Sequence, residues 1–507
     1  MLTHFILQRW PLAFVFLLGC GKGANDGHDV TTSTGPSGSG GTQTSTSGST
    51  TGGSTTGTGG GGPMGDPGCG LGAAAFCDNF NAPSANKGRA GELDVRSWSA
   101  GRVAPQLPTP HGVAIGIGPA VLPSCRPDLP AKVSPDQDSV ICNPSADVAS
   151  NHLLVTVGAQ NYGEDSFRIR QPFDFGGRTG KIVFDAEGYV ENPLWGWISV
   201  EVTEDPINAP AFALLNNDEG GILPKNAIEV QFQDQCSGHT PSPSFTVRMI
   251  DVFKNYVDKP IMPSSAPCVA TQKGKLNHFE ISLSQKRIEV RVTPFSADGT
   301  QFAAPVLLQG ADIDLPFSRG YVHITVHNHA TLKYSGDALS EWVARWDNVG
   351  FDGPIISNWR EYEVPDALAP GTDAWNRSGP VVSVGYPVAD ATKAPSATFH
   401  FRDVDPSGVT AARLSVSTWY LLDQASTVPS YVLRYRFNGK AWRDRPLTAD
   451  EVTQITGQVN QGMLGQMIDV MPADLVQGDN TLEFVTANVP QGYPPLVANV
   501  DLILTTN

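Results

Sequence analysis

Short segments in which apolar and polar residues alternate recur along most of this chain. The stretch NAIEVQF, residues 226–232, is typical, because single residues separate its apolar members Ile228, Val230 and Phe232. Successive side chains of a strand point to opposite faces, so each such segment predicts a strand with one apolar face. Segments with a helical period are rare. The chain is therefore predicted to be all-β.

The alternating segments fall into two groups, and 507 residues are too many for one ordinary core. The first group predicts a two-sheet sandwich over residues 67–354, from segments at 152–158, 180–189, 194–203, 226–232, 244–252, 278–284, 287–295, 321–329 and 344–353. The second group predicts a smaller β-sandwich over residues 355–507, from segments at 396–404, 411–422, 430–439, 480–488 and 494–507. The polar stretch SNWREYEVPDALAPG, shortly after Pro354, marks the change of unit.

One helix is predicted in the second group, in the stretch TADEVTQITGQV. It opens at Thr448, and Glu451 follows three residues later. Threonine and glutamate at this spacing form a capping box, in which each side chain accepts a backbone N–H of the other residue.

The N-terminus, MLTHFILQRWPLAFVFLLGC, predicts an export signal over residues 1–19. Its apolar run follows Arg9 and is too short to span a bilayer comfortably. The end of the run resembles a bacterial lipobox, which implies cleavage before Cys20 and attachment of lipid to that residue. An ordinary secretory signal with an incidental cysteine is the alternative.

The residues after Cys20 predict where and how the protein is held. By analogy with bacterial lipoproteins, Gly21 and Lys22 in place of aspartate favour the outer membrane, with the protein exposed on the cell surface. Residues 20–66 are rich in Gly, Ser and Thr, which cannot bury apolar area. This stretch is therefore predicted to be a flexible linker.

The other cysteines predict disulfides. An even number of cysteines in an exported chain is typical of a disulfide framework, and six of them allow fifteen pairings. Pairing between neighbours is the simplest arrangement: Cys69 with Cys77, Cys125 with Cys142, and Cys236 with Cys268. Zinc binding is the alternative, but no compact Cys/His spacing supports it.

The balance of charge excludes one class of partner. The chain has 50 Asp plus Glu against 34 Lys plus Arg. Proteins that bind nucleic acid need a basic surface to neutralise phosphates. Nucleic acid is therefore not an expected partner.

Several stretches in residues 67–354 resemble the concanavalin A-like lectin/glucanase superfamily: FCDNFN (76–81), WGWISVEVTED (195–205), NAIEVQF (226–232) and ARWDNVGFDGP (344–354). The layout is similar to laminarinase-type glycoside hydrolases, whose cleft strand reads approximately E-I-D-I-E. The resemblance implies a concanavalin A-like sandwich. It sets Ala227 at the nucleophile position, Glu229 at the assisting acid and Gln231 at the acid/base.

The residues at these three positions cannot supply the two carboxyl groups that hydrolysis needs. A retaining glycosidase needs two carboxyl groups about 5 Å apart, one to attack and one to donate a proton. Ala227 cannot attack and Gln231 cannot donate a proton as an acid, so no catalytic residue is predicted. Glu201 could supply a second carboxylate beside Glu229 if their strands are neighbours.

The favoured function is therefore carbohydrate binding without cleavage. The alternatives are a polysaccharide hydrolase or lyase with a non-standard site, and a structural or adhesive envelope protein. The candidate ligand-binding residues are aromatic side chains that can stack on sugar rings and polar side chains that can bind hydroxyls: Trp195, Trp197, Glu201, Glu229, Gln231, His323 and His327. Core packing, solvent exposure and a His-x-His metal site are the alternative interpretations of these residues.

The superfamily resemblance also implies a structural Ca²⁺ between the first and last strands of the sandwich. Asp78 and Asp347 are the carboxylates at those places, and calcium prefers oxygen ligands. The alternative is that Asp347 caps a turn or pairs with Arg345. Residues 355–507 resemble galactose-binding-like jelly rolls, through GDNTLEF (478–484) and VANVDLIL (497–504).

Overall fold

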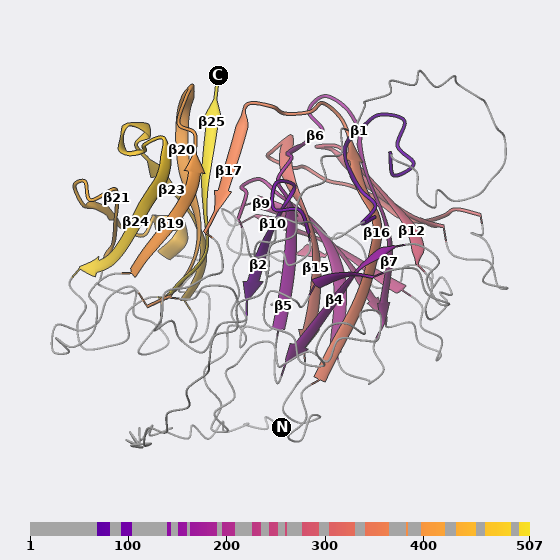
Figure 1. Cartoon of the computed structure of the whole chain (residues 1–507). Helices are drawn as coiled ribbons and strands as arrows, with labels where there is room; N and C mark the ends of the chain where they lie inside the picture. The colour runs from indigo at the N-terminus through magenta and orange to yellow at the C-terminus, as the bar shows by residue number, and fades with distance from the viewer. Residues whose placement is uncertain are drawn as a thin grey trace, which may run out of the picture. The chain divides into compact units, whose positions relative to one another are not determined.

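The computed structural model of the chain is shown in Figure 1. It describes residues 68–81, 93–103, 139–142, 151–159, 163–189, 195–207, 226–234, 243–251, 259–260, 276–293, 304–329, 340–364, 382–383, 397–420, 432–452, 462–487 and 496–507. These residues form four antiparallel sheets, two in each half of the described chain. The prediction of an all-β fold is confirmed.

The first sheet runs in the order β14-β13-β12-β7-β16-β4-β3, with β1 paired to β16. Its strands are β1 (Ala74–Asp78), β3 (Ser139–Cys142), β4 (His152–Ala159), β7 (Gly180–Tyr189), β12 (Asn277–Leu283), β13 (Arg287–Thr293), β14 (Val306–Asp312) and β16 (Ser340–Asp352).

The second sheet runs in the order β11-β10-β9-β8-β15-β5-β2, with β6 paired to β15. Its strands are β2 (Trp98–Val103), β5 (Gly163–Ile169), β6 (Phe173–Asp174), β8 (Trp195–Thr203), β9 (Asn226–Asp234), β10 (Pro243–Asp251), β11 (Lys259–Pro260) and β15 (Arg319–His329).

The first two sheets enclose one hydrophobic core and form the first sandwich. The alternating residues predicted to face inward, among them Ile198, Val230 and Phe232, are buried in that core. Phe184 of the first sheet meets Phe232 of the second edge to face, with ring centroids 5.5 Å apart. The inward faces thus carry the packing, and each strand's other residues point away from the core.

The second sandwich has a separate hydrophobic core, drawn from residues between Val364 and Leu504. One sheet has the order β17-β25-β20-β23 with β18 paired to β25, and the other β19-β24-β21-β22. The strands are β17 (Trp359–Glu363), β18 (Val382–Ser383), β19 (Ala397–Val404), β20 (Val409–Tyr420), β21 (Val432–Phe437), β22 (Arg443–Arg445), β23 (Gly462–Val470), β24 (Gly478–Ala487) and β25 (Leu496–Thr506), and a 3₁₀ turn, η3, spans Pro472–Asp474.

The predicted capping box is confirmed. Residues 449–452 are helical, the Glu451 carboxylate accepts the Thr448 N–H at 2.8 Å, and the Thr448 hydroxyl accepts the Glu451 N–H at 3.2 Å. Two orphan donors at the start of the turn are satisfied in this way.

One of the predicted disulfides is confirmed, between Cys69 and Cys77. Cys142 lies in β3, but its side chain is outside the described residues, as are Cys20, Cys125, Cys236 and Cys268. The signal, the lipid anchor and the linker also fall outside them. Among the helices of the described part of the chain, none has the length and apolar character needed to cross a membrane.

Candidate functional site

The outer face of the second sheet carries the polar residues that the sequence analysis selected. Strand β8 pairs with β9 on one side and with β15 on the other. This register sets Glu201 directly opposite Glu229 on β9 and opposite His323 on β15. Directly opposed residues have Cβ atoms about 4.5–5.5 Å apart. The two carboxylates and the imidazole therefore form one row across three strands.

This polar face is not an open trough. Glu201, Glu229, Gln231 and His323 each have 0% of their surface exposed. The Ser199 hydroxyl donates to the Glu201 carboxylate at 2.9 Å. A sugar chain cannot reach these side chains in this conformation, so the face as the structure shows it is a packed interior.

His323 is held neutral within a chain of hydroxyl groups. Thr203 donates to the carbonyl of Asp205 at 2.7 Å, so its oxygen accepts from the His323 Nε2–H at 3.0 Å. The Ser166 hydroxyl lies 3.3 Å from Nδ1 and is positioned to donate to it. Burial and the nearby Arg168 guanidinium hold the pKa of His323 well below its usual range. Both ring nitrogens are thus engaged in structural hydrogen bonds.

Ion pairs join this face to the second sandwich. The Arg168 guanidinium donates to the Glu361 carboxylate of β17, and both side chains are buried. Arg170 donates to the Glu363 carboxylate at 3.1 Å and to the carbonyl oxygen of Glu361 at 3.0 Å. We call the four residues Arg168, Arg170, Glu361 and Glu363 the latch. It holds β17 against β5 and the residue that follows β5.

Two further contacts extend the junction. The Ser99 hydroxyl donates to the Asp501 carboxylate of β25 at 3.2 Å. Arg413 of β20 donates to the Asp205 carboxylate at 3.2 Å. A polar face of the second sandwich thus meets the polar face of the first.

The other ligand-binding predictions are only partly placed. Trp195 and Trp197 lie in β8 and His327 in β15, with Trp197 opposite His327. The side chains of these three residues are outside the described part of the structure. Sugar stacking by the two tryptophans stays a prediction.

The two carboxylates of the calcium prediction have protein partners in the structure. Asp78 accepts the indole N–H of the core residue Trp98 at 2.8 Å and the Phe80 N–H at 2.9 Å, and burial raises the pKa of its carboxyl. Asp347 follows the core residue Trp346 and therefore points to the opposite face of the sheet, where it accepts the N–H of Asn348 at 2.7 Å. Asp78 and Asp347 thus accept from different donors, and a calcium ion shared by them stays a prediction.

Two related observations concern the same region. Arg345, the alternative partner of Asp347, forms an ion pair with Glu187 at 2.9 Å. Within the described ranges, no three His, Cys, Asp or Glu side chains are grouped so that they could hold a metal ion.

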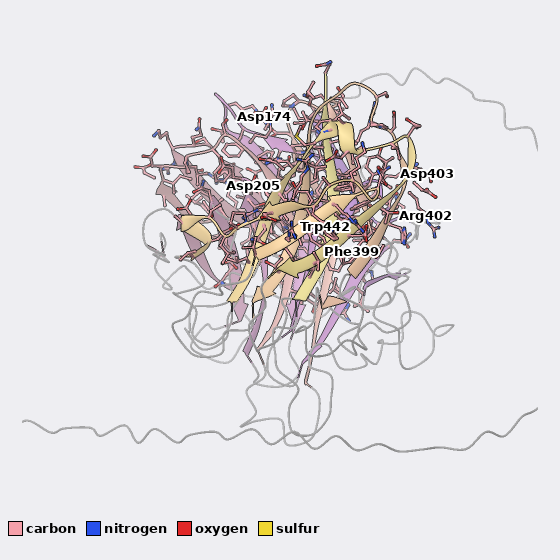
Figure 2. All side chains as sticks on the ribbon, turned by 90° about the vertical axis from the view of Figure 1, so that its left-hand side faces the viewer. Asp174, Asp205, Phe399, Arg402, Asp403 and Trp442 are labelled. Carbon is pink, nitrogen blue, oxygen red and sulfur yellow. A yellow bond between two sulfur atoms is a disulfide. The ribbon has the colours of Figure 1, made fainter. Side chains whose placement is uncertain are left out.

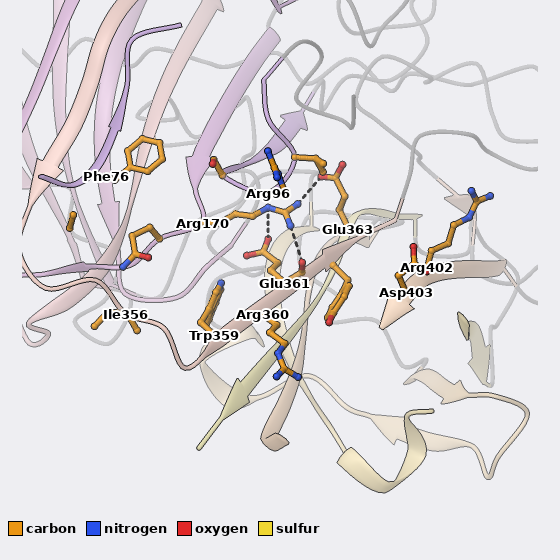
Figure 3. Close-up of a pocket in the computed structure, with 15 residues that line it drawn as sticks. Phe76, Arg96, Arg170, Ile356, Trp359, Arg360, Glu361, Glu363, Arg402 and Asp403 are labelled. Atoms are coloured by element: carbon orange, nitrogen blue, oxygen red, sulfur yellow. Dashed lines mark hydrogen bonds and ion pairs between the residues drawn. The ribbon is translucent and has the colours of Figure 1, made fainter. Parts of the chain in front are cut away.

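A pocket of about 880 Å³ lies at the junction of the two sandwiches (Figure 3). This volume is in the upper part of the range typical of ligand sites, which often lie where domains meet. Its lining combines aromatic and charged side chains: Phe76, Arg96, Arg170, Trp359, Arg360, Glu361, Tyr362, Glu363, Arg402 and Asp403. Trp359 is half-buried and its ring packs on Tyr321, with centroids 5.3 Å apart.

Most charges in this pocket are already paired. Arg170 engages the latch carboxylates. Arg96 pairs with Asp94 at 2.7 Å, and Arg360 pairs with Asp405 at 2.9 Å. Arg402 and Asp403 are exposed and have no hydrogen-bond or ion-pair partner in the described residues. They are the lining charges left available for a ligand.

This pocket was not predicted from the sequence, because WREYE, residues 359–363, lies in the polar stretch that marks the change of unit. The stretch does alternate, but Tyr362 packs against the second core, so Glu361 and Glu363 face away from that core and meet Arg168 and Arg170 of the first sandwich. Buried carboxylates indicate a partner of opposite charge. That alternation of glutamates was the available signal.

No protein-family model matches this chain, and no curated protein matches it. Among solved structures, it is similar to the legume lectin-like domain from Entamoeba histolytica, at 15% identity and a TM-score of 0.28, over 43% of this chain and 89% of that one. It is also similar to a variant of LamA from Z. galactanivorans in complex with laminaritriose and laminaritetraose, at 11% identity and a TM-score of 0.31, over 56% of this chain and 99% of that one. Lectin II from Ulex europaeus matches at 10% identity and a TM-score of 0.28, over 43% of this chain and 92% of that one. These neighbours are concanavalin A-like sandwiches, and at such scores they carry no argument about function.

Proposed function

We propose that this protein binds carbohydrate without cleaving it, and that the pocket at the junction of the sandwiches is the site. The pocket itself carries the proposal. Trp359, Phe76 and Tyr362 offer aromatic surface to sugar rings, and Arg402 and Asp403 offer groups to hydroxyls. Aromatic faces pack on the apolar faces of sugars, and a few polar groups then fix their orientation.

Burial of the carboxylates supports binding over hydrolysis. Glu201 and Glu229 lie directly opposite each other on neighbouring strands, and a retaining glycosidase needs two carboxyl groups close together. Catalysis also requires that the glycosidic bond lie between them, and both side chains are fully buried. We therefore expect no release of reducing sugar.

We further propose that the protein is attached to the outer membrane through lipid on Cys20 and is displayed at the cell surface. The lipobox-like sequence and the Gly/Ser/Thr-rich linker support this location. Replacement of Cys20 by alanine should move the protein from the membrane fraction to the soluble fraction. Equal membrane retention of the two proteins would refute the anchor.

Binding is tested with the whole chain on an array of glycans, followed by titration of the best ligand. Replacement of Trp359 by leucine should weaken binding about tenfold, because stacking on an aromatic ring contributes roughly 0.5–1.5 kcal/mol beyond its buried area. Trp442→Leu is the matched control. Trp442 is also half-buried, but it packs under Arg436, with 4.4 Å from the guanidinium to the ring, and does not line the pocket.

Three results would contradict the proposal. No retained glycan would favour a structural or adhesive role instead. Equal loss of binding in the two tryptophan variants would remove the pocket as the site. Release of reducing sugar that disappears in Glu229→Gln would establish a hydrolase.

A further inference from the structure

A β-bulge lies at the rim of the pocket, where β19 pairs with β24. Arg402 and Asp403 together face the single residue Asp479, between the regular pairs on either side. A bulge bends its strand and re-aims the side chains, and bulges are enriched next to functional sites. Figure 2 shows Arg402 and Asp403 next to each other at the edge of the second sandwich. Figure 3 shows them at one end of the pocket, with Phe76 and Ile356 at the other end and Trp359 between.

The backbone at this bulge is strained, and in the described residues no hydrogen bond of the Asp403 side chain offsets that strain. Asp403 has φ +54°, in the left-handed region that residues other than glycine rarely adopt. Asn438 has a similar φ of +51°, but its side chain donates to Asp474 and Asn480 at 2.9 Å and accepts from the Thr481 N–H at 2.9 Å. The Asp403 carboxylate makes no such bonds within the described residues. Strained backbone positions are enriched at active sites and ligand-binding positions.

The two side chains offer complementary chemistry side by side. The Arg402 guanidinium is only a donor, and the Asp403 carboxylate is only an acceptor. A sugar hydroxyl is both, so two neighbouring hydroxyls can accept from the first and donate to the second. An acidic sugar would meet the carboxylate and a chain of net charge −16, and an amino sugar would meet the guanidinium.

We propose that Arg402 and Asp403 form the subsite that determines the specificity of this pocket, and that the subsite takes a vicinal diol of a neutral sugar. This inference rests on the proposed function and names its ligand class. The aromatic end of the pocket holds one part of an oligosaccharide, and the bulge selects the hydroxyl arrangement of another.

The test compares the whole parent chain with Arg402→Gln and Asp403→Gly by calorimetric titration with neutral oligosaccharides that the array retains. Each substitution should weaken binding about 10- to 100-fold, since each removes a charge-assisted hydrogen bond. Binding by the parent should change less than about twofold between low salt and about 0.5 M salt, because the ligand is uncharged.

Thermal stability separates a binding role from a structural one. Glycine adopts the left-handed conformation without penalty, so Asp403→Gly should unfold at the parent's temperature or slightly above it. Asn438→Gly, the matched control, should unfold at a lower temperature because it loses its hydrogen bonds.

Different results would overturn the subsite and the proposed carbohydrate-binding function. Unchanged affinity in both bulge variants, with binding still lost in Trp359→Leu, overturns the subsite and leaves the function standing. Tighter binding of acidic or amino sugars than of neutral ones overturns the ligand class. A lower unfolding temperature for Asp403→Gly marks a structural residue, and a parent that retains no glycan overturns both proposals.

Discussion

At the residue scale, whether a polar side chain can reach a ligand depends on what packs over it. His323, Glu201 and Glu229 were selected from the sequence as separate candidates for ligand binding, and the structure sets them in one row across three strands. The sequence does not predict that this face is buried, because contacts such as that of Arg168 with Glu361 join residues 193 positions apart in the chain. Alternation reports which residues share a face and says nothing about what packs on it.

The buried, neutral His323 predicts a pH dependence of stability. Its pKa in the folded protein lies well below its usual value, so the unfolded chain binds a proton that the folded chain does not. Titration of His323 therefore leaves the free energy of unfolding unchanged above about pH 6.5. Below that pH, it lowers the free energy of unfolding by about 1.4 kcal/mol per pH unit. When the free energy of unfolding is measured with urea between about pH 5 and pH 8, it should change less steeply with pH for His323→Gln than for the parent.

The control for this prediction is an exposed histidine. His400→Gln, at an exposed position of β19, should keep the slope of the parent. If the slope of His323→Gln matches that of the parent, His323 is not neutral in the folded protein. The hydroxyl chain around it would then need a different proton arrangement.

At the element scale, strands with one clearly apolar face were predictable from the sequence, and strands rich in charged residues were not. The segment predicted at 180–189 matches β7, and that at 226–232 falls within β9. The sequences of β5, GEDSFRI, and of β17, WREYE, are richer in charge. The polar faces of these strands lie at the junction of the sandwiches, so ion pairs take the place of apolar packing there.

The bulge in β19 marks another limit. The segment predicted at 396–404 locates the strand correctly, but the sequence FRDV contains no glycine or proline to announce a break in the ladder. The extra residue follows from the register that β24 imposes, with Phe401 opposite Asn480 and Val404 opposite Gly478. Such a feature depends on pairing between distant strands, and local patterns do not contain it.

At the scale of the whole molecule, two apolar cores are joined through polar contacts. The core of the first sandwich is drawn from residues between Phe80 and Phe351, and that of the second from residues between Val364 and Leu504. In the described chain, these clusters share no residue. Each sandwich can therefore retain its own packing, and the latch supplies the buried ion pairs among the contacts that couple them.

Removal of the latch carboxylates should uncouple the two sandwiches. In Glu361→Gln/Glu363→Gln, the guanidinium groups of Arg168 and Arg170 stay buried but lose the latch carboxylates, and loss of one partner of a buried ion pair costs about 3–5 kcal/mol. Because each sandwich keeps its own core, we expect scanning calorimetry to show two unfolding transitions for this variant and one for the parent.

The control breaks an ion pair inside one sandwich. Glu483→Gln removes the partner of Arg436, at 2.6 Å, within the second sandwich. It should lower the unfolding temperature without dividing the transition, because the latch stays intact. A single transition in the latch variant would mean that contacts other than these ion pairs couple the sandwiches. In that case, the pocket between them would keep its shape when the latch is lost.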